Sequence, residues 1–214
     1  MDQNLSRIRK EYGKKRLSVA GLPDDPLVLF SDWISDALDH EDREPAAMVL
    51  STADKNGFPS SRIVLLKGIE NGHFLFFTNY KSRKSREIEE NENVSLLFFW
   101  PGAERQVRIS GKAGILPRSE SEKYFKTRPY ESRISAYASV QSAVIPSRDW
   151  LEDRIKELKK KYPEGREIPL PEYWGGFAVF PLGIEFWQGR EARLHDRIEY
   201  LRNNDGWIRR RLSP

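Results

Sequence analysis

The sequence predicts a mainly β fold with helices, of the α+β class, in which antiparallel strands build a barrel or a sandwich. Short strand-like segments follow one another with tight turns between them, and one polar, helix-like stretch at about residues 117–162 interrupts them. The chain of 214 residues is long enough for one domain with a substantial core, and its 12% aromatic content argues against disorder.

A polar N-terminal arm and a helix are predicted ahead of the strands. Residues 1–16 form the arm, which we expect to be mobile until something binds it, and residues 17–214 form the single domain. The helix is capped by Asp25, has Pro26 in its first turn and stops before Pro45. Its apolar stripe is expected at Leu27, Phe30, Ile34 and Leu38.

The strands are predicted from apolar runs bounded by turn residues. They cover residues 46–53, 60–69, 73–78, 94–100, 105–116, 177–180, 184–187, 193–202 and 207–212. Asn71-Gly72 and Asp205-Gly206 are expected to be hairpin turns. The polar residues 79–93 are interpreted as a loop and a helix, and the helical insert is expected to contain helices at 119–126, 134–139 and 147–162.

Composition excludes several classes of protein. The chain has no cysteine, which excludes disulfides, thiolate metal sites and a cysteine nucleophile. Its three histidines lack metal-ligand spacing, and no nucleophile elbow, Walker or dinucleotide-binding motif is present, so we expect no metal. No secretory signal and no apolar run long enough to span a bilayer is found, so we expect a soluble, cytoplasmic protein without a membrane partner.

The charge of the chain is concentrated at its ends. The formal net charge is +4, made up of +4 over residues 1–16, +3 over residues 190–214 and −3 between them. A nucleic-acid-binding protein usually has a basic stripe along one helix or sheet face. This distribution favours small anions over nucleic acid.

Two segments in the middle of the chain are candidates for anion recognition. Residues 78–85 leave a strand and enter a helix, so backbone N–H groups, hydroxyls and the cations Arg83 and Lys84 could converge on a phosphate. A solvated charged loop is the alternative, slightly favoured on this segment alone. Arg62 and Lys67 bracket four apolar residues and lie on opposite faces of a regular strand unless a bulge or strand end intervenes, so alone they are better interpreted as strand-end charges.

A third segment lies near the C-terminus. A strand over residues 193–197 puts Arg193, His195 and Arg197 on one face, where the charges would disfavour one another without a nearby anion. A solvated basic face is an equal alternative, and the preceding Phe186 and Trp187 favour a site for a planar ligand. The neutral groups of Gln106, Gln141 and Ser142 could bind the edge of a heteroaromatic ring or could simply be surface residues.

Taken together, these motifs and others in the same order closely resemble the pyridoxine (pyridoxamine) 5′-phosphate oxidase family. The matching segments are residues 62–67 with Thr78, 82–84, 104–107, 123–125, 128–129, 141–142, 186–189 and 193–197. The similarity runs from about Arg9 to the C-terminus. It implies a split β-barrel homodimer with FMN bound at each subunit interface.

The resemblance also implies roles for individual residues. The FMN contacts implied are Arg62, Ile63, Val64, Leu65, Leu66, Lys67, Phe77, Thr78, Arg83, Lys84, Gln106, Gln141, Ser142, Trp187 and Arg197. The substrate contacts implied are Lys67, Tyr124, Arg128, Ser132, Arg193, Leu194 and His195, with Arg9, Lys10, Glu11 and Tyr12 as a lid. Phe77 departs from the tyrosine that relatives often carry, which removes any hydroxyl contact there but not a backbone role.

The activity implied is oxidation of pyridoxine or pyridoxamine 5′-phosphate to pyridoxal 5′-phosphate, with O2 as acceptor and H2O2 as product. The amine also yields ammonia. The substrate C4′ would lie near flavin N5, and Arg193 and His195 are the expected catalytic residues, with His195 only a candidate for taking the proton. A related split-barrel flavoprotein reductase, a non-catalytic flavin-binding protein and a basic binding module are the alternatives.

Overall fold

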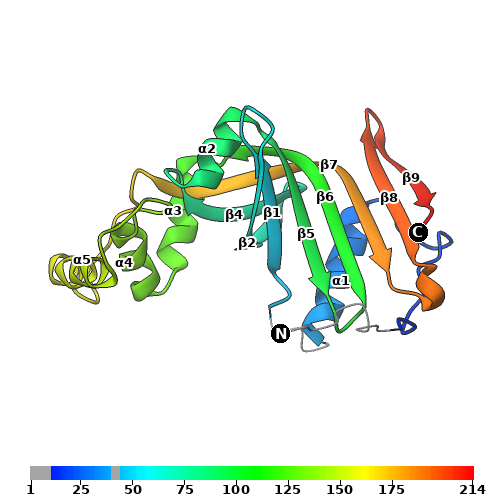
Figure 1. The fold of residues 1–214 in the computed structure, drawn as a ribbon, viewed down its shortest axis with the longest axis horizontal. Helices are drawn as coiled ribbons and strands as arrows, with labels where there is room; N and C mark the ends of the chain where they lie inside the picture. The colour runs from blue at the N-terminus through cyan, green and yellow to red at the C-terminus, as the bar shows by residue number, and fades with distance from the viewer. Residues whose placement is uncertain (1–10, 40–43) are drawn as a thin grey trace, which may run out of the picture. The chain divides into compact units, whose positions relative to one another are not determined.

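The computed structural model of the protein describes residues 11–39 and 44–214 (Figure 1). The chain divides into two compact units. The first comprises Met1–Leu50, Ser95–Gly111 and Pro181–Pro214, and the second comprises Ser51–Val94 and Lys112–Phe180. Residues 1–10, which form most of the predicted arm, lie outside the described residues.

Strands account for most of the regular structure. They are β1 (Ala47–Ala53), β2 (Pro59–Leu65), β3 (Gly68–Glu70), β4 (His73–Asn79), β5 (Asn93–Trp100), β6 (Arg105–Ile115), β7 (Trp174–Gln188), β8 (Asp196–Asn203) and β9 (Gly206–Leu212). They form a 9-stranded sheet in which neighbours follow the order β2-β1-β5-β6-β7-β4-β3, with β8 paired to β7 and β9 to β8. The predicted mainly β fold with helices is therefore confirmed.

The first unit contains helix α1 (Pro26–Asp39), which begins as predicted. The Asp25 carboxylate accepts a hydrogen bond from the Leu27 backbone N–H at 2.9 Å, so Asp25 is the N-terminal cap. The predicted apolar stripe is partly wrong, because Leu38 is 63% exposed. The side chains that α1 buries include Leu29, Phe30, Trp33 and Ala37. This face is selected by aromatic packing, since Trp33 meets the Phe186 ring edge-on with centroids 5.2 Å apart.

The predicted strands at 177–180 and 184–187 are one strand, β7, which continues through Pro181. Before the proline, β7 pairs with β4 as far as Val179, and after it β7 pairs with β8 from Gly183 onward. Because Pro181 lies between these two pairings, its missing N–H interrupts neither of them.

The strand predicted at 193–202 begins three residues later than expected, at Asp196, the first residue of β8. Residues Glu191–Arg193 form a 3-10 turn in which Ala192 has φ 51° and Arg193 has φ 60°. The prediction that Arg193, His195 and Arg197 share one strand face is therefore wrong. The hairpin that follows pairs Asn203 with Gly206, so its two turn residues lie one position earlier than predicted.

The second unit confirms the predicted hairpin at Asn71-Gly72. Glu70 pairs with His73, and the two turn residues have φ 50° and 78°.

The helices of the second unit are α2 (Arg83–Glu90), α3 (Arg118–Thr127), α4 (Tyr130–Ala138) and α5 (Arg148–Lys161). The last three lie within the predicted insert and pack around a core that includes Phe125, Ile134 and Trp174. Among the described residues, no helix has the length and apolar character needed to cross a membrane.

Candidate functional site

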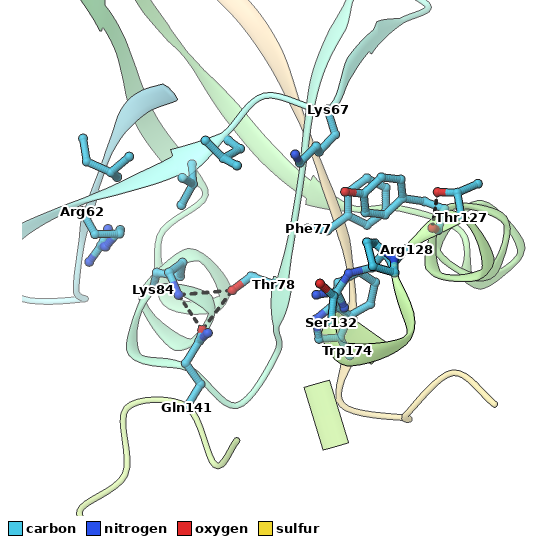
Figure 2. Close-up of a pocket in the computed structure, with 15 residues that line it drawn as sticks. Arg62, Lys67, Phe77, Thr78, Lys84, Thr127, Arg128, Ser132, Gln141 and Trp174 are labelled. Carbon is cyan, nitrogen blue, oxygen red and sulfur yellow. Dashed lines mark hydrogen bonds between the residues drawn. The ribbon is translucent and has the colours of Figure 1, made fainter. Parts of the chain in front are cut away.

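The second unit contains a pocket of about 550 Å³ (Figure 2). Strands β2 and β4, helices α2, α3 and α4 and the start of β7 all contribute to it. Its lining residues are Arg62, Ile63, Val64, Leu65, Lys67, Phe77, Thr78, Lys84, Tyr124, Thr127, Arg128, Pro129, Ser132, Gln141 and Trp174. Four of them are cationic and none is acidic, so the pocket favours anionic ligands.

Lys84 is placed in the pocket by the turn between β4 and α2. The buried Asn79 side chain organises this turn, because its carbonyl oxygen accepts a hydrogen bond from the Lys81 backbone N–H at 2.8 Å. Lys84 Nζ then donates to Gln141 Oε1 at 2.7 Å and to Thr78 Oγ1 at 3.2 Å. Figure 2 shows these three side chains grouped around one point.

The charge of Lys84 is incompletely compensated. Burial lowers its pKa, the charge of Arg62 lowers it further, and Glu87 only partly opposes them, which leaves the pKa at about 8. An anion bound beside Lys84 would supply the missing stabilisation of its ammonium.

Arg62 is held in place by hydrogen bonds to residues that do not line the pocket. Its guanidinium donates to Thr52 Oγ1 at 2.6 Å and to the buried Glu87 carboxylate at 3.2 Å. Burial alone would raise the pKa of Glu87, but hydrogen bonds from Ser60, Thr52 and Arg83 and the charge of Arg62 lower it to about 2. Glu87 is therefore ionised at neutral pH and fixes Arg62 as a positioned cation.

The other group of side chains in the pocket is aromatic and cationic. Phe77 and Tyr124 stack with ring centroids 3.9 Å apart, and Trp174 is stacked 5.7 Å from Phe77. The Arg128 guanidinium lies 4.5 Å from the Trp174 centroid. Arg128 Nη1 is buried without a hydrogen-bond partner, and burial lowers the pKa of this residue. A buried, unsatisfied guanidinium nitrogen in a pocket that the Ser132 hydroxyl also lines favours a bound anion.

Lys67 reaches the same pocket because β2 ends at Leu65. The backbone N–H of Lys67 then bonds to the Leu75 carbonyl at 2.8 Å. The strand therefore ends between Arg62 and Lys67, which is one of the two conditions under which the sequence allows them to share a face. The alternation of side chains between the two faces of β2 does not continue as far as Lys67. Within β2, Ile63 is 62% exposed and Leu65 is 36% exposed, so they present an apolar surface.

The first unit brings together a second group of predicted residues. His195 lies 4.5 Å from the Trp187 ring centroid, and Tyr12 meets both rings edge-on at 5.7 Å from Trp187 and 6.0 Å from His195. The Arg190 backbone N–H donates to His195 Nδ1 at 3.1 Å. Burial and then the charge of Arg193 lower the pKa of His195, so we expect a neutral ring whose proton is on Nε2.

Arg197 belongs to an ion-pair cluster in the same unit. Its Nε donates to Glu185 Oε1 at 2.7 Å, and Arg108 bonds to the other oxygen of this buried carboxylate. A cavity of about 180 Å³ lies beside the cluster, lined by Leu97, Gln106, Arg108, Glu185 and Trp187. Gln106 and Trp187 therefore face one cavity.

The structure thus divides the predicted site residues into groups. Most of the predicted FMN contacts and four of the substrate contacts line the large pocket, whereas Arg193, Leu194 and His195 lie in the other unit with Gln106, Trp187 and Arg197.

A few predicted site residues line neither cavity. Leu66 is a core residue, 8% exposed. Arg83 and Ser142 meet outside the lining, through the Arg83 N–H and Ser142 Oγ at 3.2 Å. Of the predicted lid, Arg9 and Lys10 lie outside the described residues, while Glu11 and Tyr12 are described.

Some residues of the site are not among those predicted from the sequence. Trp174, Thr127 and Pro129 line the pocket, and Glu87 holds Arg62. The spacing of Arg83 and Glu87, four residues apart on one helix, could have indicated the ion pair between them. Trp174 carries no comparable local signal, because it reaches the pocket through the pairing of β7 with β4.

Comparisons with known proteins give a consistent result. Residues 34–162 match the family model described as pyridoxamine 5′-phosphate oxidase, and residues 174–214 match the pyridoxine 5′-phosphate oxidase C-terminal dimerisation region. A pyridoxine/pyridoxamine 5′-phosphate oxidase from Leptospira biflexa serovar Patoc is 53% identical over 211 residues, with 99% of each chain covered. One from Haemophilus influenzae is 50% identical, with 98% of this chain and 99% of the relative covered.

A solved structure extends the comparison to the fold. PhzG from Burkholderia lata 383, in complex with tetrahydrophenazine-1-carboxylic acid, superposes with a TM-score of 0.89 at 31% identity, covering 96% of this chain and 100% of that chain. This likeness, together with the match to the C-terminal region, confirms the predicted split β-barrel fold.

Proposed function

The chain belongs to the pyridoxamine 5′-phosphate oxidase family, and from this premise we propose that it is an FMN-dependent oxidase that forms pyridoxal 5′-phosphate. Pyridoxine 5′-phosphate and O2 would give pyridoxal 5′-phosphate and H2O2. Pyridoxamine 5′-phosphate, O2 and water would give the same aldehyde, H2O2 and ammonia.

The observation that carries the proposal is the charge of the large pocket. No acidic side chain among the described residues lines it. We divide its cations into two groups, Arg62 with Lys84, whose pKa the charge of Arg62 lowers, and Lys67 with Arg128. Two phosphate groups, one from a cofactor and one from a substrate, would satisfy both groups. A single small anion would leave one of them uncompensated.

The first group fits the phosphate of FMN. Lys84, Thr78 and Gln141 offer an ammonium, a hydroxyl and an amide at one point, and Arg62 is fixed nearby by Glu87. The exposed apolar side chains Ile63 and Leu65 line the same pocket and suit the flat ring system. FMN, when bound, supplies the redox chemistry by accepting a hydride from the substrate and passing the electrons to O2.

The second group fits the phosphate of the substrate. Arg128 would donate its unsatisfied Nη1 to that phosphate, with Ser132, Tyr124 and Lys67 as further donors. The stack of Tyr124, Phe77 and Trp174 limits the freedom of Tyr124 and, through its contact with Trp174, of Arg128. The substrate would therefore be oriented by its phosphate end, away from the reacting carbon.

We assign Arg193 and His195 to the reacting end of the substrate. Because His195 Nδ1 already accepts the Arg190 N–H, the neutral ring presents Nε2–H as a donor, which suits holding a substrate oxygen or nitrogen. The match of residues 174–214 to a dimerisation region indicates a homodimer. We place FMN at the subunit interface, where Gln106, Trp187 and Arg197 would also contact it.

The proposal is tested by turnover in air. The FMN-loaded protein is given pyridoxamine 5′-phosphate or unphosphorylated pyridoxamine, and aldehyde and H2O2 are measured. We expect equal amounts of both products from the phosphorylated amine and far slower turnover of pyridoxamine. A flavin-containing protein that forms neither product would favour a reductase or a non-catalytic flavin-binding protein, and failure to take up FMN would contradict the proposal entirely.

A further inference from the structure

Glu104 has an unusual environment for a glutamate. It lies in the turn between β5 and β6, is only 3% exposed and has φ 57°. A buried carboxylate is costly unless hydrogen bonds satisfy it, and a positive φ is uncommon for a residue of this type. Two unfavourable features at one residue indicate that its partners compensate for them.

The partners of the Glu104 carboxylate belong to the N-terminal arm. Glu104 Oε2 accepts the backbone N–H groups of Gly13 at 2.9 Å and of Lys14 at 3.1 Å. Lys14 Nζ also donates to the Gly102 carbonyl at 2.7 Å in the same turn. The turn therefore binds the arm both through its backbone and through a side chain.

The same turn is bonded to the end of β7. The Glu104 carbonyl accepts the Gly189 N–H at 2.8 Å and the Gln188 side-chain amide at 3.2 Å. A Cβ atom added at Gly189 would lie 2.8 Å from both Cβ and Cγ of Tyr12, so the glycine provides the space that Tyr12 occupies. Glu104 thus joins the arm to the segment that precedes Arg193 and His195.

From these contacts we propose that Glu104 is a latch that holds residues 11–16 of the arm in place. By fixing Gly13 and Lys14, the latch positions Tyr12 edge-on to Trp187 and His195. Glu104 is a positioning residue, since it acts on the site through Tyr12. Its catalytic consequence rests on the proposed function, whereas the latch itself does not.

Trypsin tests the latch without any activity measurement. Lys14, Lys15 and Arg16 offer cleavage sites within the arm, and the exposed Lys55 in the turn after β1 is an internal reference. Glu104→Asn shortens the acceptor and introduces a residue type that tolerates positive φ, and Glu104→Gln keeps the length of the side chain but replaces the charged acceptor with an uncharged one. Glu92→Asn, at an exposed glutamate paired with Lys112, is the matched control.

In FMN-loaded protein without substrate, we expect Glu104→Asn to be cut after residues 14–16 at least about ten times faster than wild type, because two bonds to a charged acceptor are lost. Cleavage after Lys55 should be unchanged, Glu92→Asn should behave as wild type, and Glu104→Gln should fall between. Arm cleavage at the wild-type rate in Glu104→Asn would overturn the latch. Faster cleavage at Lys55 to the same extent would also overturn it, because that result indicates general destabilisation.

Kinetics then test the link to catalysis. Glu104→Asn should raise KM for pyridoxamine 5′-phosphate several-fold more than it lowers kcat and should leave the FMN dissociation constant unchanged. An unchanged KM together with a freed arm would overturn the positioning role. If the protein proved to have no oxidase activity, the proposed function would fail while the trypsin result still decided the latch.

Discussion

FMN binding should weaken as pH rises above about 8, because of Lys84. In the protein without FMN, burial and the charge of Arg62, partly opposed by Glu87, lower the pKa of Lys84 to about 8. A phosphate dianion beside the ammonium would raise that pKa again. Binding would therefore take up a proton above pH 8, and by linkage the affinity must fall as pH rises.

The size of the effect follows from the two pKa values. If bound phosphate returns the pKa of Lys84 from about 8 to its ordinary 10.5, the FMN dissociation constant at pH 9.5 is roughly 20 to 30 times its value at pH 7. This ratio corresponds to about 2 kcal/mol of binding free energy. A smaller rise in the pKa of Lys84 on binding would reduce this ratio, but the dissociation constant would still increase with pH.

The assay is titration of the FMN-free protein with FMN between pH 7 and pH 9.5, followed by quenching of flavin fluorescence. In Lys84→Arg the guanidinium stays charged over this range, so the dissociation constant should be nearly independent of pH. Lys112→Arg, at an exposed lysine paired with Glu92, should keep the wild-type dependence. A flat wild-type curve, or a Lys84→Arg curve as steep as wild type, would refute the reasoning.

Other predictions concern the substrate and the arm. Arg193→Ala should lower kcat far more than FMN content, whereas Lys84→Ala should release FMN; equal FMN loss in both, read from the visible spectrum, would contradict the assigned roles. Arg128→Met should raise KM for pyridoxamine 5′-phosphate by roughly 10- to 100-fold, because a charge-assisted hydrogen bond is lost, with FMN affinity as the control. Deleting residues 1–16 should leave a yellow dimer with weaker catalysis, and a circular dichroism spectrum of an unfolded chain would contradict the lid.

Local chemistry explains which elements were predictable from the sequence. The hairpin at Asn71-Gly72 and the cap at Asp25 depend on residues that are adjacent in the chain, and both are confirmed. The buried face of α1 was not predictable in the same way. It is selected by Trp33 packing on Phe186, which is distant in sequence.

The candidate site shows the same division. Lys67 and Lys84 can be identified as candidates from the sequence, but their meeting in one pocket depends on the end of β2 and on the turn that Asn79 organises. The strand predicted through Arg193 failed because Ala192 and Arg193 adopt positive φ without being glycine. The arm contacts of Glu104 join residues about ninety positions apart, so no local pattern could predict them.

The central claim is that this chain uses bound FMN to oxidise a phosphorylated B6 vitamer. Its most direct test is an anaerobic titration of the FMN-loaded protein with pyridoxamine 5′-phosphate, recording the visible flavin spectrum and the aldehyde formed. The proposed function predicts loss of the oxidised flavin absorption with one pyridoxal 5′-phosphate formed per FMN, and return of that absorption with H2O2 on admission of air. A flavin spectrum that stays oxidised at saturating substrate would contradict the claim.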